Sequence, residues 1–287
     1  FPPGKKDPVL AGTVLENMLN AHVETYHLLK SIPGSEKVKI GLVKNIFQFD
    51  PLRRWHLLDW AFSKILNDVY TNAPIEFLKT GKSSFYMPGM VENEMLNPEA
   101  PGTLDFIGLN YYSRMHVKGR LNPQEPFVFD TRQQDIMTDM GYPLYAEGFY
   151  RALKTISEVG VPIYVTENGL ADDKDTVRPL FIKRYLYALN QALKERIDIR
   201  GYFYWSLMDN FEWAEGYSMK FGLYEVNLET QERKLRKGSQ PFIDMVNERG
   251  TDERGYLVRI GETAPDFTMD YTTGEQVKLS DFRGKVV

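Results

Sequence analysis

The sequence has no cysteine, few histidines and no long apolar run, and each absence excludes a class of site. Without cysteine, the 287 residues can form no disulfide and no thiolate metal site. No apolar stretch approaches the roughly 18 residues of a membrane-spanning helix. The histidines lack the three- or four-residue spacing that places two metal ligands on one helix face; they are His22, His27, His56 and His116. We therefore expect no metal centre and no membrane span.

The charge balance also lacks any basic excess. The formal net charge is −4 with 26% charged residues, so nucleic acid and anionic membranes are not expected partners. Aromatic residues make up 13% of the chain, which fits either core packing or a cleft that stacks on ring-shaped ligands. The chain opens with FPPG and no methionine, so the lack of a targeting signal excludes nothing.

Apolar periodicity predicts helices that alternate with strands. We expect helices at residues 9–31, 55–78 (broken or kinked at Pro74), 146–159, 176–196 and 240–249, strands at 38–43, 106–113, 162–167, 199–206 and 222–227, and loops at 80–103 and 114–143. Such alternation indicates parallel strands joined by crossover helices. A doubly wound sheet would also fit. However, no glycine-rich loop follows a strand, so no dinucleotide or other cofactor is expected. Long loops follow strands, which favours a barrel with its site at the strand ends.

Glu167 ends one of these strands, in the sequence IYVTENG. A carboxylate at the carboxyl end of a buried barrel strand is where such folds place catalytic groups. The alternative is a glutamate that merely opens a turn. Strict alternation assigns residues to shared faces: Asn110 with Tyr112, Ile163 and Val165 with Glu167, and Phe203 with Trp205. If these faces meet, a phenol and an amide hold the carboxylate ionised, as a nucleophile requires. Barrel-core packing is the alternative for Asn110 and Tyr112.

Residues 201–217, GYFYWSLMDNFEWAEGY, combine seven aromatic residues with three carboxylates. The carboxylates belong to Asp209, Glu212 and Glu215. Indole rings pack on the apolar face of a sugar while carboxylates accept its hydroxyl hydrogen bonds. The segment therefore predicts a site for a polyhydroxylated ring. An aromatic loop cluster with surface acids is the alternative.

The motifs TENGLA, DFIGLNYYS and WSLMDNFEWAEGY followed by FGLYEVN resemble the second half of glycoside hydrolase family one, the retaining β-glucosidase family. The resemblance covers residues 1–250. It implies an α/β fold, a (β/α)8 TIM barrel of which this chain holds about four strands and their helices. It also implies a β-glycoside or oligosaccharide substrate.

The resemblance also implies roles for seven side chains. These are Glu167 as nucleophile, Tyr112 as its hydrogen-bond donor, Asn110 in the same glycone subsite, Trp205, Glu212 and Trp213 as sugar contacts, and Phe221 near the sugar C6. Relatives that accept 6-phosphorylated sugars replace the residue at Glu212 with a small polar residue and add a lysine and a tyrosine. Here Glu212, Met219 and Phe221 occupy those positions, so we expect an unphosphorylated glycoside.

The family's acid/base glutamate lies in an Asn-Glu-Pro motif, which this sequence does not contain. Glu92 and Glu94 lie in a predicted polar loop and are no substitutes. Without the acid/base residue, we expect negligible hydrolytic activity. Four parallel strands also cannot close an eight-stranded barrel and leave two edges unpaired, so we expect the chain alone to aggregate or be unstable. A catalytically silent sugar-binding relative is the alternative function. A glutamine at the acid position would instead indicate cleavage of thioglycosides.

Residues 251–287 form a second expected unit. Their motifs IGETAPDF and SDFRGKVV resemble the start of a thioredoxin-like redoxin domain, which here would be incomplete. Some thirty residues cannot bury a core of their own. A degenerate extension is one alternative, and a hydrolase–redoxin fusion with a thiol-disulfide role is another.

Overall fold

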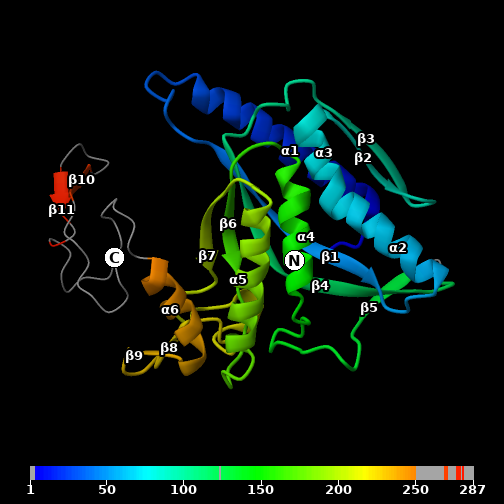
Figure 1. Cartoon of the computed structure of the whole chain (residues 1–287). Helices are drawn as coiled ribbons and strands as arrows, with labels where there is room; N and C mark the ends of the chain where they lie inside the picture. Colours follow the sequence, from blue (N-terminus) through cyan, green and yellow to red (C-terminus); the bar gives the residue numbers. More distant parts are fainter. Residues whose placement is uncertain (1–3, 123, 250–267, 271–275, 279, 281–287) are drawn as a thin grey trace.

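The computed structural model describes residues 4–122, 124–249, 268–270, 276–278 and 280. Four parallel strands form its main sheet in the order β1, β4, β6, β7 (Figure 1). Their bounds are Gly41–Pro51 for β1, Phe106–Gly119 for β4, Ile163–Asn168 for β6 and Ile199–Tyr204 for β7. β5 (Phe127–Asp130) pairs antiparallel with the far end of β4. The predicted α/β class with a parallel sheet is confirmed.

Six α-helices in the described part of the chain accompany the main sheet. They are α1 (Pro8–Lys30), α2 (Leu57–Asn67), α3 (Ala73–Thr80), α4 (Ala146–Ser157), α5 (Arg178–Lys194) and α6 (Gln240–Arg249). α2 to α5 lie between the strands of the sheet in the sequence, whereas α1 packs against α3 and β3 (Val91–Leu96). α4 and α5 lie side by side in Figure 1. Their apolar faces meet the sheet in one core, which includes Ile107, Leu109, Phe149, Leu153, Ile163, Val165, Phe181 and Tyr185. The strands bury one face of the sheet against the helices. The opposite face, called the concave face, leaves Val43 and Phe203 exposed.

The predicted break at Pro74 takes a milder form. Between α2 and α3 the chain stays helical through a π-helical turn, Asp68–Asn72. Proline has no N–H to donate and its ring crowds the preceding turn. A wider π turn just before it accommodates the mismatch without ending the helix.

Two predicted loops contain strands. Residues 80–103 include the antiparallel hairpin of β2 (Lys82–Met87) and β3 (Val91–Leu96), so the loop prediction is wrong there. The hairpin buries one face, with Phe85 and Met95 among its buried side chains. Its strands do not alternate strictly, because Lys82–Ser84 are all polar and Phe85–Met87 are all apolar, so the period of a half-buried strand was hidden. Likewise, the predicted connection after residue 113 begins with an extension of β4 and includes β5.

Short elements complete the described chain. They are the 3-10 turns Trp213–Glu215 and Lys237–Ser239, the hairpin of β8 (Tyr224–Val226) and β9 (Arg233–Leu235), and the hairpin of β10 (Thr268–Asp270) and β11 (Gln276–Lys278). The redoxin-like motifs lie largely outside the described residues. No helix in the described part of the chain is both long and apolar enough to cross a membrane.

Candidate active site at the ends of β4, β6 and β7

Tyr112 and Glu167 form the centre of the site. The Tyr112 hydroxyl donates a hydrogen bond of 2.5 Å to Oε2 of Glu167. Asn110 of β4 pairs with Glu167 of β6, and Tyr112 lies two residues after Asn110 on the same strand. This register brings the side chains of Tyr112 and Glu167 to the same level of the sheet. Burial, followed by the hydrogen bond to Glu167, raises the pKa of the Tyr112 hydroxyl well above its usual range. The phenol therefore remains a donor across the neutral pH range.

A β-bulge aims Glu167 at this site. Val165 pairs with Leu109 and Glu167 pairs with Asn110, so Thr166 is one residue too many on β6. The predicted common face of Ile163, Val165 and Glu167 is therefore wrong. Ile163 and Val165 are buried in the core beneath the helices. The extra residue turns Glu167 to the concave face, whereas strict alternation would have placed it on the buried face with Ile163 and Val165.

Polar side chains on both sides hold the bulge. Thr166 Oγ1 donates to Asn110 Oδ1 at 2.6 Å, so the amide oxygen of Asn110 is engaged by Thr166. Asn168 turns to the buried face, where its Nδ2 donates to the Tyr111 carbonyl at 2.7 Å. Its Oδ1 accepts a hydrogen bond of 2.8 Å from the Tyr202 hydroxyl. Sequence reasoning missed Thr166 and Asn168 because a bulge leaves no periodic signal.

Glu212 is the second carboxylate of the site. Burial raises the pKa of Glu212 above its ordinary value, a hydrogen bond from the Trp205 side chain opposes this, and the charge of Glu167 adds to the increase. Oε2 of Glu212 is buried and has no hydrogen-bond partner among the described residues. An acceptor in this state is ready to receive a hydroxyl donor from a ligand.

Phe221 and Trp213 differ sharply in burial. Phe221 is 4% exposed, and its ring meets the Tyr112 ring edge-on at 6.1 Å between centroids. Trp213 is 81% exposed in its short 3-10 turn. The structure thus brings Phe221 to the Tyr112–Glu167 pair and leaves the Trp213 ring largely open to solvent.

Asp209 does not present its carboxylate to a ligand. Its oxygens accept hydrogen bonds from the Gly222 backbone N–H at 2.9 Å and from Arg236 Nη2 at 2.8 Å. Both partners belong to the same long segment after β7. The predicted grouping of Asp209 with the sugar-facing carboxylates is therefore wrong, because this buried charge is already paired inside the protein.

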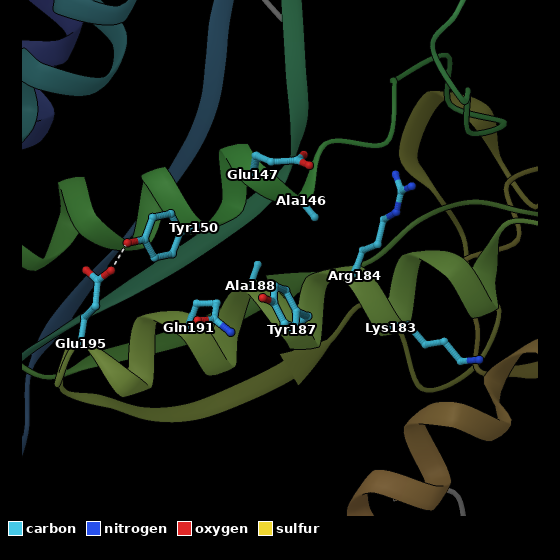
Figure 2. Close-up of a pocket in the computed structure, with 9 residues that line it drawn as sticks. All are labelled: Ala146, Glu147, Tyr150, Lys183, Arg184, Tyr187, Ala188, Gln191 and Glu195. Atoms are coloured by element: carbon cyan, nitrogen blue, oxygen red, sulfur yellow. Dashed lines mark hydrogen bonds between the residues drawn. The ribbon is translucent and has the colours of Figure 1, made fainter.

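A cavity on the outer side of the molecule is separate from this site. It opens between α4 and α5, and none of the predicted site residues lines it (Figure 2). There the Tyr150 hydroxyl donates a hydrogen bond to the Glu195 carboxylate. No group of three or more histidine, aspartate or glutamate side chains in the described ranges could hold a metal ion.

The family model for glycosyl hydrolase family 1 matches residues 1–251, and the chain belongs to this family. It is 32% identical over 280 residues to a β-galactosidase of Pyrococcus woesei, which covers 88% of this chain and 54% of that relative. It is 31% identical over 274 residues to β-glucosidase A of Thermotoga maritima, covering 88% of this chain and 59% of that relative. The chain spans little more than half the length of these relatives.

Solved structures share the fold. The β-glycosidase from Pyrococcus horikoshii matches with a TM-score of 0.71 and 35% identity, over 83% of this chain and 54% of that one. The family 1 β-glucosidase from Thermotoga maritima matches with a TM-score of 0.73 and 28% identity, over 88% of this chain and 60% of that one. The parallel sheet is thus part of a TIM-barrel-like fold.

Proposed function

We propose that this chain supplies the nucleophile and the glycone subsite of a retaining β-glycosidase that acts on unphosphorylated β-glycosides. The observation that carries the proposal is the Tyr112–Glu167 hydrogen bond beside the unpartnered buried oxygen of Glu212. The names of the relatives, β-galactosidase and β-glucosidase A, support the same substrate class.

In the proposed reaction an oxygen of Glu167 attacks the anomeric carbon of the sugar. A covalent glycosyl-enzyme forms, and the bond to the leaving group breaks with its electron pair. Tyr112 keeps the carboxylate aimed by donating to its other oxygen. Because this donor is a phenol of raised pKa, it does not compete for the negative charge.

The proposed roles of the surrounding residues concern binding of the glycone. Glu212 accepts sugar hydroxyl hydrogen bonds at its free oxygen, and Trp205 offers its ring to the apolar face of the sugar. Phe221 closes the pocket near C6, Trp213 contributes a further hydroxyl contact, and Asn110 borders the same subsite. A phosphorylated sugar is disfavoured because its charge would face the Glu212 carboxylate.

Retaining hydrolysis needs a second carboxyl group about 5–5.5 Å from the nucleophile, to protonate the leaving oxygen and then activate water. The sequence contains no Asn-Glu-Pro motif to supply it. We therefore expect the 287-residue chain to react with sugars whose leaving group departs without a proton. Turnover of ordinary β-glucosides should be negligible.

A mechanism-based label tests the proposal. In 2-deoxy-2-fluoro-β-glucosyl fluoride, Glu167 would displace fluoride and retain the fluoroglucosyl group. We expect intact-mass spectrometry to show one adduct, located by digestion on the peptide that contains Glu167. Tyr112→Phe should slow labelling by about 10- to 100-fold, the value of a hydrogen bond to a charged group.

Glu167→Gln should remain unlabelled, whereas Glu229→Gln, which changes an exposed carboxylate between β8 and β9, should label like the parent. An adduct on Glu167→Gln would sink the nucleophile assignment. Saturable binding of the sugar without any adduct on the parent chain would instead favour the silent sugar-binding relative.

We also propose that residues 1–250 and 251–287 are separate units. The family match ends at residue 251, which supports a boundary there. The redoxin-like character of the second unit, and the fusion it implies, remain predictions. A Cys-X-X-Cys motif shortly after Val287 in a longer reading frame would favour them, and its absence would contradict them.

A further inference from the structure

Arg178, the first residue of α5, is the largest fully buried side chain among the described residues. Its guanidinium lies between the loop that follows β6 and the segment that follows β7. We propose that Arg178 is a positioning residue that locks these two connections together and thereby fixes Phe221 against Tyr112. The inference rests on the proposed function, because those connections flank Glu167 and carry the proposed sugar contacts.

One set of contacts ties Arg178 to the loop that follows β6. Nε donates to Asp175 Oδ1 at 2.8 Å, and Nη2 donates to the Asp172 carbonyl at 2.9 Å. Nη1 reaches the Leu170 carbonyl at 3.4 Å. The backbone N–H of Arg178 also donates to Asp172 Oδ2 at 2.8 Å, which ties the start of α5 to the same loop.

A second set of contacts ties Arg178 to the segment that follows β7. Nη2 donates to the Lys220 carbonyl at 2.9 Å, and Nη1 donates to the Phe221 carbonyl at 3.2 Å. Nη1 also donates to the Tyr204 hydroxyl at the end of β7, at 2.8 Å. With both sets of contacts, all three guanidinium nitrogens are engaged, so no part of this buried cation lacks a partner.

The planar fork explains why an arginine occupies this position. One rigid group donates in several fixed directions at once, which the point charge of a lysine cannot reproduce. Leu170 lies three residues after Glu167, and Phe221 stacks edge-on against Tyr112, the donor to Glu167. A shift of the Phe221 backbone would therefore change the wall of the sugar pocket while leaving the Tyr112–Glu167 bond in place.

The test compares Arg178→Gln with the parent chain by two readouts. The first is hydrogen–deuterium exchange of peptides that cover residues 169–177 and 218–223. We expect exchange in both peptides to quicken together by about tenfold or more, because one clamp protects both. The second is labelling by the fluoroglucosyl fluoride. There the half-saturating concentration should rise by about tenfold, while the saturated rate falls less than about threefold.

Two further variants separate positioning from general stability. Tyr204→Phe removes a single contact of the fork and should give a smaller change of the same kind. Asp59→Asn breaks the ion pair between Arg53 and the buried Asp59 of α2, and should lower the melting temperature without changing either readout. Unchanged exchange at residues 218–223 in Arg178→Gln would overturn the clamp, as would an equal effect of Asp59→Asn. If the parent is never labelled, the proposed function fails, and the exchange experiment still decides the clamp.

Discussion

Two residues of the site differ in whether their hydrogen-bonding groups have partners. Tyr112 has its donor satisfied by Glu167, whereas Glu212 keeps one buried oxygen without a partner. The first arrangement fixes a reacting group before any ligand arrives. The second is a cost to the folded protein that a sugar hydroxyl would remove, because buried polar groups are ordinarily paired.

Glu212→Gln tests that cost through its pH dependence. Burial and the charge of Glu167 raise the folded-state pKa of Glu212, which means that folding favours its protonated form. The contribution of this carboxyl to stability is therefore fully present below its unfolded pKa. That effect is lost as the pH rises through the folded pKa. At pH 7 the ionised side chain therefore lowers the free energy of unfolding. We expect Glu212→Gln to raise the melting temperature at pH 7 by a few degrees, on the order of 2–4 °C.

Thermal scans at pH 7 and pH 4, each against the parent at the same pH, measure the difference. The gain should shrink at pH 4, where the parent carboxyl is largely protonated. The same variant should bind the sugar label more weakly. Glu215→Gln, an exposed change in the same segment, should shift the melting temperature little at either pH. A Glu212→Gln protein less stable than the parent at pH 7 would contradict the assignment.

Whole elements position these residues through the bulge in β6 and the close approach of β6 and β7. Gly169 follows β6 directly, and a Cβ on it would lie 1.7 Å from the Trp205 carbonyl oxygen. The Trp205 N–H donates to the Asn168 carbonyl at 3.0 Å, so the two strand ends are in direct contact. Glycine is required here by space, because any side chain would push Trp205 away.

Gly169→Ala should therefore destabilise the fold by about 1–3 kcal/mol or more and strongly reduce labelling of Glu167. Equilibrium denaturation measures the first effect and adduct formation the second. Gly12→Ala is the matched control, because the nearest atoms to its added Cβ all belong to side chains, those of Phe85 at 3.1 Å and Asn93 at 3.5 Å. If Gly169→Ala keeps both the parental stability and the parental labelling, the strand ends tolerate more movement than this packing implies.

Sequence patterns predicted most elements but not this register. The helix at 9–31 and the strands around Phe106, Ile163 and Ile199 follow from apolar periodicity, which a sequence displays directly. The face of Glu167 does not, because it depends on Thr166 being unpaired against β4. The partners of Arg178 and Asp209 were likewise hidden, since long-range contacts of a buried charge have no local signature.

At the scale of the whole molecule, the main sheet has two edges that no described strand covers. Within the described residues, β1 and β7 each pair with one strand of the main sheet. The concave face between them exposes apolar side chains, with Val43 at 52% and Phe203 at 58%. Added Cβ atoms at Gly108 and Gly201 would contact Val43 and Phe203 respectively, which places both on that face. Such edges and apolar patches are templates for association with another chain.

We therefore expect the 287-residue chain to self-associate as its concentration rises, which sedimentation velocity would detect. The double change Val43→Lys and Phe203→Lys should shift the distribution toward monomer, because charges on an exposed face oppose edge-to-edge pairing. Leu121→Lys is the control: it removes a 93% exposed apolar side chain just beyond β4 and should leave association unchanged. A parent chain that stays monomeric at every concentration would contradict the prediction. An equal effect of Leu121→Lys would show that the concave face is not the surface responsible.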